Sequence, residues 1–473
     1  MLGLYVHTHW GYNHPYAART WTLPDWTAYL DALKALGYDT VMIWPQTEAM
    51  PVPPTPSDVA FLEKMRQVID LAHKRFGMQV LIVGAANVLF KPNSTNSTFE
   101  NRSYWESARN VDPKDRDSIE AMLRARAVQW EPLALADGLV IIDSDPGGWP
   151  DSPSEDFVEF FRLQGDVMGK LNPKSKLYYW MWQGWPVNVA LETYLKTLTL
   201  LKEKVKRPWE VFSCYDVHLE ATDIQNMTRE RTFFPYNLVE FEPSFPLINA
   251  NAGWFRQEIR RYDPALYPGG LMINAQTHCL QIPRIYLSAH YALGGTMATE
   301  KMMVLAEKLI PGPAGVALGF AWQLMEDDRD CTAMRKYGAQ LRKEAARSQK
   351  AGPLAGLMMM TPERYLQDVA DNIDIRADFI ELRIAIESGR ELKKTLSRLL
   401  EHLKPYRDRL GYNYICWEGP LRKRMLDPLA TLQVQAVNAA MWPPPDKIHP
   451  KGYLVHFLDV LEEYVTSLKA PGL

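Results

Sequence analysis

The sequence predicts a (β/α)₈ barrel over residues 1–300, followed by an all-helical region over residues 301–473. Two observations lead to this fold class. Short apolar, β-prone runs alternate with helical segments eight times in about 290 residues, which is the size and order of a closed barrel. After about residue 300 such strand-like runs no longer occur. A doubly wound open sheet is the alternative, but the first predicted strand is not followed by a glycine-rich phosphate-binding turn.

The predicted strands are short apolar runs that end in turn or polar residues. The run Leu139–Ile142, for example, is wholly apolar, as expected of a parallel strand that is buried on both faces. The eight predicted strands are Gly3–His7, Thr40–Trp44, Gln79–Gly84, Leu139–Ile142, Lys176–Trp182, Glu210–Tyr215, Phe233–Phe241 and Leu271–Ala275.

The predicted helices carry start and stop signals. The first begins at the capping residue Thr22, has Pro24 in its first turn, repeats apolar residues at helical spacing and stops at Gly37. The second stops at Gly77. The predicted helices are Thr22–Leu36, Ala60–Phe76, Arg116–Ala134, Ser154–Lys170, Ala190–Val205, a short piece near Thr222–Arg229, Gly253–Tyr262 and Arg284–Ala292.

The C-terminal third of the chain is rich in helix-forming residues. Helical patterns run over Gln367–Lys404, Leu421–Ala440 and Gly452–Leu468, and the sequence WPPP at Trp442–Pro445 interrupts them. We interpret this region as a helical appendage and as a candidate interface for a homodimer.

Composition excludes several classes of protein. A net charge of −3 does not favour nucleic acid or an anionic membrane surface as a partner. The four cysteines are far apart and form no CxxC motif, which argues against a disulfide scaffold or a structural zinc site. The chain has no apolar run of about 18 residues, so no transmembrane helix is expected. The first residues, MLGLYVHTHW, lack the features of a signal peptide, which favours the cytoplasm.

The carboxyl ends of barrel strands converge on one mouth, and in this sequence they carry acids, amides, histidines and aromatic rings. This mixture suits a neutral polyhydroxylated ligand such as a carbohydrate, because acids and amides bind hydroxyl groups and rings stack on sugar faces. The candidate substrate-binding residues are His7, His9, Trp10, Trp44, Gln46, Glu48, Asn87, Trp182, Gln183, Tyr215, Asp216, Gln276 and His278.

Two strand ends carry paired acids. Asp143 and Asp145 follow the fourth strand, before a Pro-Gly-Gly turn, and Glu240 and Glu242 end the seventh. Glycosidic cleavage needs one protonated acid and one carboxylate that acts as nucleophile or base. The sequence therefore predicts a glycoside hydrolase with Asp145 as acid and Glu240 as its opposing group. Asp143 and Glu242 are the alternates, because strict alternation puts both members of each pair on one face.

Two segments resemble those of a known family. The sequence VIIDSDPGGWPDSPSEDF resembles the fourth-strand segment of bacterial α-glucuronidases, and LVEFEPSFPL resembles a later strand of the same enzymes. The resemblance implies a catalytic acid at Asp145 and a base at Glu240. Thr277 stands where the family has its second acid. A more distant likeness to hexosaminidase-type barrels is equally admissible, although their adjacent Asp-Glu pair is absent after the fourth strand.

Two other classes of function stay open. His7 and His9 lie two residues apart on a strand, as in metal-dependent amidohydrolases, and His278 could join them. The ligand set is otherwise incomplete, so we expect no bound metal and no organic cofactor. A non-catalytic carbohydrate-binding barrel would keep the aromatic residues without needing a matched pair of acids.

Overall fold

The computed structural model describes most of the chain. The described residues are 1–8, 18–92, 98–102, 104–143, 154–181, 191–213, 230–234, 252–275, 281–296, 298–327, 329–359, 361–406 and 453–468. The chain divides into two compact units. The first, here called the barrel unit, comprises Met1–Gly11, Ala17–Leu238 and Gln257–Ala275, and the second, the helical unit, comprises Tyr12–Tyr16, Val239–Arg256 and Gln276–Leu473. A domain boundary at residue 300 stays a prediction.

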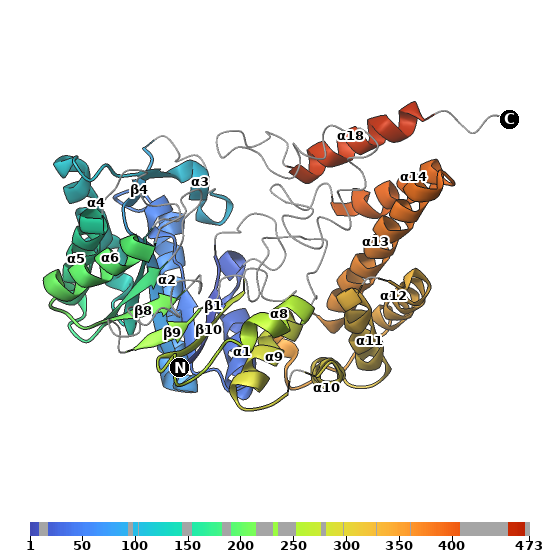
Figure 1. Ribbon diagram of the computed structural model, residues 1–473, viewed down its shortest axis with the longest axis horizontal. Helices are drawn as coiled ribbons and strands as arrows, with labels where there is room; N and C mark the ends of the chain where they lie inside the picture. Colours follow the sequence, from blue (N-terminus) through green and yellow to red (C-terminus); the bar gives the residue numbers. More distant parts are fainter. Residues whose placement is uncertain are drawn as a thin grey trace. The chain divides into compact units, whose positions relative to one another are not determined.

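The barrel unit contains a closed barrel of eight parallel strands, which confirms the predicted fold class. Around the barrel the order is β1-β10-β9-β8-β7-β6-β3-β2. Figure 1 labels β1, β8, β9 and β10 of this barrel. The strands are β1 Leu2–Val6, β2 Thr40–Ile43, β3 Gln79–Ala85, β6 Gly138–Ile142, β7 Lys176–Met181, β8 Trp209–Ser213, β9 Arg231–Phe233 and β10 Gly270–Ala275. Strand seven was predicted over 233–241, but in the structure β9 begins two residues earlier and ends at Phe233.

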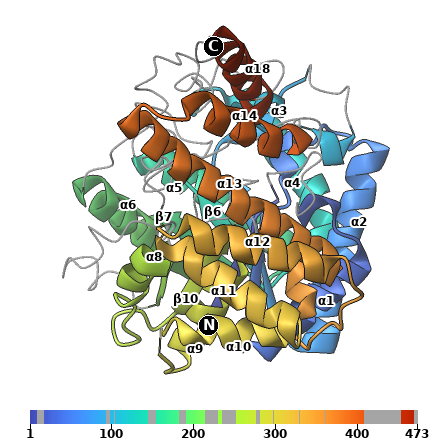
Figure 2. The same ribbon diagram turned by 90° about the vertical axis from the view of Figure 1, so that its right-hand side faces the viewer.

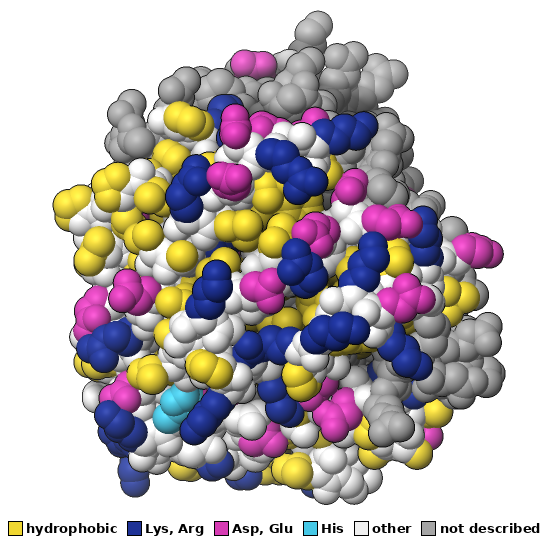
Figure 3. All heavy atoms as spheres, turned by 90° about the vertical axis from the view of Figure 1, so that its left-hand side faces the viewer, with side chains coloured by type: hydrophobic (Ala, Val, Ile, Leu, Met, Phe, Trp, Pro, Cys, Tyr) yellow, Lys and Arg dark blue, Asp and Glu magenta, His cyan; other side chains and the backbone are white. Residues whose placement is uncertain are grey.

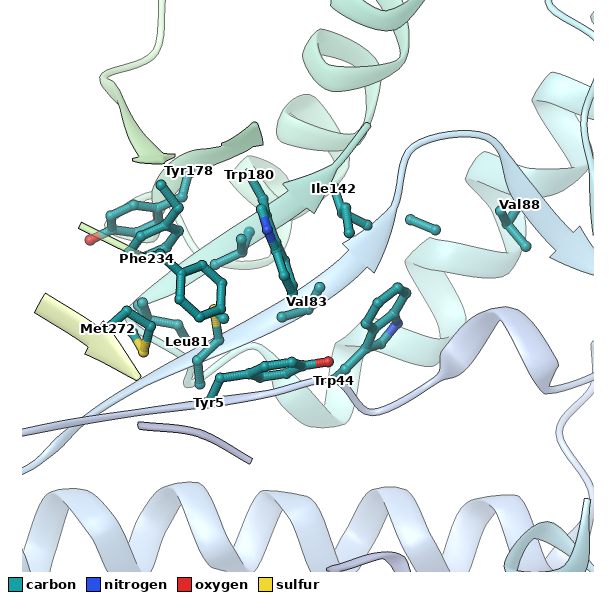
Figure 4. Packing of buried hydrophobic residues seen from close by; sticks show 14 of the residues in the cluster. Tyr5, Trp44, Leu81, Val83, Val88, Ile142, Tyr178, Trp180, Phe234 and Met272 are labelled. Atoms are coloured by element: carbon teal, nitrogen blue, oxygen red, sulfur yellow. The ribbon is translucent and has the colours of Figure 1, made fainter. Parts of the chain in front are cut away.

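Alternate residues of the strands fill the barrel interior. Tyr5, Trp44, Trp180 and Phe234 come from four different strands or strand ends and meet in one buried cluster (Figure 4). Their rings pack mainly edge to face, with the Tyr5 and Trp180 centroids 5.3 Å apart. Because side chains alternate along a strand, the residues between these positions face the surrounding helices.

The helices of the barrel unit form where the sequence places them. Helix α1 (Leu23–Ala35) begins with a capping box in which Thr22 and Asp25 bond each other's backbone N–H groups. Helix α2 (Pro56–Leu71) has an equivalent box from Thr55 and Asp58 and ends at Gly77 after a turn of π-helix, Ala72–Phe76. The remaining helices after strands are α4 (Arg116–Trp130), α5 (Ser154–Leu171), α6 (Leu191–Lys204) and α8 (Ala252–Ile259), the last of which spans the division between the two units.

The sequence analysis missed an insertion after β3. Strands β4 (Val88–Phe90) and β5 (Ala108–Asn110) form a two-stranded antiparallel sheet, and the short helix α3 (Tyr104–Ser107) lies between them. Val88 and Tyr104 from this insertion belong to the same buried cluster as the barrel interior. The insertion therefore packs at the carboxyl end of β2, where the Tyr104 ring lies 5.8 Å from that of Trp44.

In the helical unit, successive helices pack side by side (Figure 2). The long helical pattern predicted over 367–404 is two helices, because Gly389 and Glu391 adopt left-handed conformations between α13 and α14. The helices are α9 (Ile282–Ala292), α10 (Glu300–Leu309), α11 (Pro313–Asp327), α12 (Cys331–Ala345), α13 (Pro362–Ser388), α14 (Leu392–Leu403) and α18 (Tyr453–Ser467). The pattern predicted over 421–440 lies outside the described residues.

A network of ion pairs joins three of these helices. Asp378, on α13, has a fully buried side chain and accepts hydrogen bonds from Arg335 of α12 and from Arg398 and His402 of α14. Burial alone would raise the pKa of Asp378, but the hydrogen bond from His402 and the charge of Arg335 outweigh it and hold that pKa below its usual value. The network thus joins α12, α13 and α14 through paired charges on the sides where these helices meet.

The described surface shown in Figure 3 carries both signs of charge, with basic and acidic side chains interspersed. Neighbouring residues form ion pairs in the barrel unit, where Arg162 of α5 binds Glu159 and Asp166 and Arg124 of α4 binds Glu120. Exposed pairs of this kind contribute little to stability. Within the described residues, no helix is both long enough and apolar enough to cross a membrane.

Candidate functional site

The candidate site is the end of the barrel at which the strands finish, and six of its predicted residues are described. They are His7, Trp44, Gln46, Glu48, Asn87 and Asp143. The other predicted site residues lie outside the described residues: His9, Trp10, Asp145, Trp182, Gln183, Tyr215, Asp216, Glu240, Glu242, Gln276 and His278. The geometry below therefore concerns the segments that follow β1, β2, β3 and β6.

Glu48 lies in the short 3-10 helix Thr47–Ala49, directly after β2, and its carboxylate binds groups of the protein itself. One carboxylate oxygen accepts a hydrogen bond from the indole N–H of Trp44 at 3.2 Å, and the other accepts one from the backbone N–H of Ala85 at 2.9 Å. The guanidinium of Arg126 lies 3.4 Å from Glu48, and both side chains are fully buried. Glu48 therefore holds the Trp44 ring and the end of β3 in place.

Gln46 has an unusual backbone conformation for a residue with a side chain. Its φ angle is 55°, in the left-handed region that residues other than glycine rarely adopt. Its side-chain carbonyl accepts a hydrogen bond from Arg19, which is also fully buried. Strain of this kind persists only where the surroundings enforce it, and it often occurs at binding sites.

Asn87, just past β3, is tied to the start of the chain segment after β5. The side-chain amide of Asn87 donates to the backbone carbonyl of Val111 at 3.0 Å, and the backbone carbonyl of Asn87 accepts from the Val111 N–H at 2.8 Å. His7, just past β1, is buried, and its ring meets the Tyr5 ring edge-on at 5.4 Å. Both residues thus lie at strand ends as predicted, with the Asn87 amide donating to the protein backbone.

Asp143 directly follows β6, and the hydroxyl of Tyr179 donates a hydrogen bond to it at 2.9 Å. Tyr179 is a β7 residue that packs against Phe157 and Phe161 of α5. Because Ile142 and Trp180 belong to the interior cluster, their neighbours Asp143 and Tyr179 face the helix layer. Burial and the nearby Asp143 charge raise the pKa of the Tyr179 hydroxyl, which keeps it protonated as a donor.

Three residues at this end of the barrel were not selected from the sequence. They are Arg19 and Arg126, which bind the segments after β2 and β3, and Tyr179, which binds Asp143. An arginine or tyrosine is ordinary in a helix or strand, so only its burial and partners reveal such a role. Among the described residues, no group of three or more His, Cys, Asp or Glu side chains could hold a metal ion.

Comparison with known proteins finds resemblance only in three-dimensional structure. No family model matches the chain, and no curated protein matches it in sequence. Solved structures similar to it include a mutant O-GlcNAc hydrolase from Thermobaculum terrenum (11% identity, TM-score 0.44), for which the match covers 93% of this chain and 98% of that one.

A family 89 glycoside hydrolase from Clostridium perfringens, solved in complex with PUGNAc, has 11% identity and a TM-score of 0.48 over 99% of this chain and 64% of that one. An N-acetylneuraminate lyase from Proteus mirabilis has 11% identity and a TM-score of 0.33 over 69% of this chain and 88% of that one. Glycoside hydrolases thus occur among the similar structures, alongside a lyase.

Proposed function

We propose that the protein is a glycoside hydrolase that cleaves its substrate at the carboxyl ends of the barrel strands. The observation that supports the proposal is the position of β6 in a closed barrel: the strand ends at Ile142, and the acids Asp143 and Asp145 come directly after it in the sequence, where barrel enzymes carry their catalytic groups. The segments after β1, β2 and β3 carry further polar and aromatic side chains at the same end of the barrel: His7, the Trp44 indole and the Gln46 and Asn87 amides.

In the proposed reaction Asp145 donates a proton to the leaving glycosidic oxygen, and Glu240 acts as the nucleophile or activates water. If Glu240 is the nucleophile, the sugar forms an ester with Glu240, and water that gives its proton to the Asp145 carboxylate then hydrolyses this ester. If Glu240 is the base, water attacks the sugar directly and gives its proton to Glu240. In both cases the departing oxygen keeps the proton from Asp145. Glu242 is the alternate to Glu240. The hydrogen bond from Tyr179 to Asp143 supports a positioning role for Asp143 and leaves Asp145 as the proposed acid.

The substitution Asp145→Asn tests this function on a panel of 4-nitrophenyl glycosides and natural oligosaccharides. Because proton transfer contributes about 10²–10⁴-fold, turnover should fall by that order while binding of the cleaved sugar changes much less. Glu240→Gln should behave in the same way. Asp156→Asn, which removes a carboxylate from the first turn of helix α5, is the control and should keep normal turnover.

Near-normal turnover in both the Asp145 and Glu240 variants would refute the assignment. If no glycoside is cleaved but sugars bind, the carbohydrate-binding alternative is supported instead. Loss of hydrolysis on chelation, together with stoichiometric zinc, would favour the metal-dependent alternative built on His7 and His9.

A further inference from the structure

Arg19 connects the segments that follow three successive strands. It lies in the 3-10 helix Ala18–Thr20 and is fully buried. Its Nε donates to the carbonyl of Thr8 at 3.0 Å, and one terminal nitrogen donates to the carbonyls of Phe99 at 2.9 Å and Arg102 at 2.6 Å. The other terminal nitrogen donates to the side-chain carbonyl of Gln46.

These acceptors come from separate parts of the barrel end. Thr8 follows β1, Gln46 follows β2, and Phe99 and Arg102 belong to the insertion after β3. The Phe99 ring also lies 4.8 Å from the Arg19 guanidinium carbon. One planar cation therefore sets the spacing of the first three strand-end segments.

The same contacts enforce the conformation of the β2 end. The hydroxyl of Thr8 donates to the backbone carbonyl of Trp44, so the segment held by Arg19 is bonded directly to the residue that carries the indole ring. Gln46, held through its side chain, keeps its left-handed backbone. Lys64 of α2 in turn donates to the Arg19 carbonyl at 2.9 Å, which fixes the short helix.

We propose that Arg19 is a positioning residue for substrate binding, which aligns the segments carrying His7, Trp44 and Gln46 without taking part in proton transfer. This inference rests on the proposed function, in which the reacting acids follow the other strands, β6 and β9. Lysine cannot replace it, because four acceptors in different directions need the forked donors of a guanidinium rather than a single ammonium group.

The test compares Arg19→Lys with Arg207→Lys. Arg207 makes the same kind of contact, donating to the carbonyls of Asn172, Pro173 and Ser175, but it lies before β8, at the opposite end of the strands. On a cleaved 4-nitrophenyl glycoside, Arg19→Lys should raise KM about tenfold and leave kcat within about twofold, because only binding geometry is lost. Arg207→Lys should change neither constant.

Hydrogen exchange followed by mass spectrometry provides a second measurement that needs no substrate. Arg19→Lys should lower the protection against exchange of residues 44–50 and 98–102 but not of β8. Arg207→Lys should leave the protection of residues 44–50 unchanged. An equal fall in kcat and kcat/KM, or unchanged KM with unchanged exchange, would overturn the role of Arg19. Failure of the proposed function is distinguishable, since it appears as retained turnover in Asp145→Asn.

Discussion

The substitution Glu210→Gln should remove a pH dependence from the stability of the barrel. Glu210 on β8 lies beside Glu230, because Val211 pairs in register with Arg231. On the other side, Lys176 of β7 lies 3.0 Å from the Glu210 carboxylate, whose side chain is 14% exposed. Burial and the hydrogen bond with Glu230 raise the pKa of Glu210 to about 7, and Lys176 only partly opposes them.

The direction of the effect follows from proton linkage. A carboxyl group whose pKa is higher in the folded than in the unfolded protein binds its proton more tightly when folded. The stability it contributes is therefore present below its ordinary pKa of 4.5 and is lost as the pH rises through about 7. At about 1.4 kcal/mol per pKa unit the upper limit is about 3 kcal/mol, and solvent screening beside the exposed Glu230 lowers the expected effect to roughly 1–2 kcal/mol.

The charged groups that face Glu210 are known from the strands on either side. They are Lys176 from β7 and Glu230 before β9, while Tyr178 on β7 has its pKa raised by burial and by the acids near it. Arg231 points to the other face of β9, with its guanidinium 5.7 Å from the Tyr267 ring. The local balance of charge at this end of β8 is thus acidic, as the prediction requires.

The assay is hydrogen exchange of β8 and β9 at pH 4.0, below the ordinary pKa of Glu210, and at pH 8.5, above its raised pKa, each variant being compared with wild type at the same pH. Glu210→Gln should match wild type at pH 4.0 and be more protected at pH 8.5. Glu120→Gln, which alters an exposed ion pair on α4, is the control and should follow wild type at both values. If Glu210→Gln shows the same loss of protection with pH as wild type, the reasoning is refuted.

Three further predictions concern buried partners. Glu48→Gln should lower the free energy of unfolding in urea by about 3 kcal/mol, because Arg126 then stays buried with a neutral partner. Adding Arg126→Met should recover most of that stability. A loss below about 1 kcal/mol in the single variant would contradict this prediction. Asp378→Asn should destabilise the helical unit by about 3 kcal/mol, measured by hydrogen exchange of α12 to α14. In the wild type, the stability that Asp378 contributes should be present above the ordinary carboxyl pKa and lost as the pH falls, because its pKa is lowered in the folded protein. Unchanged protection in the variant would contradict the prediction. Tyr179→Phe should lower stability by about 1 kcal/mol in thermal unfolding, through loss of its hydrogen bond to Asp143, and an unchanged melting temperature would refute that bond's contribution.

Local pattern in the sequence determined the strands and helices of the barrel. The apolar run at 139–142 and the capped helix after Thr22 depend on neighbouring residues alone, so their positions were predicted to within a few residues. The insertion with β4 and β5 was missed because its strands are only three residues each, too short for a periodic signal. The break at Gly389 was missed because helix-forming residues continue on both sides of it.

The partners of individual side chains were decided only by the tertiary structure. From the sequence, Glu48 is an acid near a strand end and is predicted to bind substrate, whereas closure of the barrel brings Ala85 and Arg126, from 37 and 78 residues further along the chain, onto its carboxylate. Arg19 gains its acceptors in the same way. Local sequence determines which residues reach the end of a strand, but which of them bind one another depends on contacts between distant segments, and these exist only once the barrel has closed.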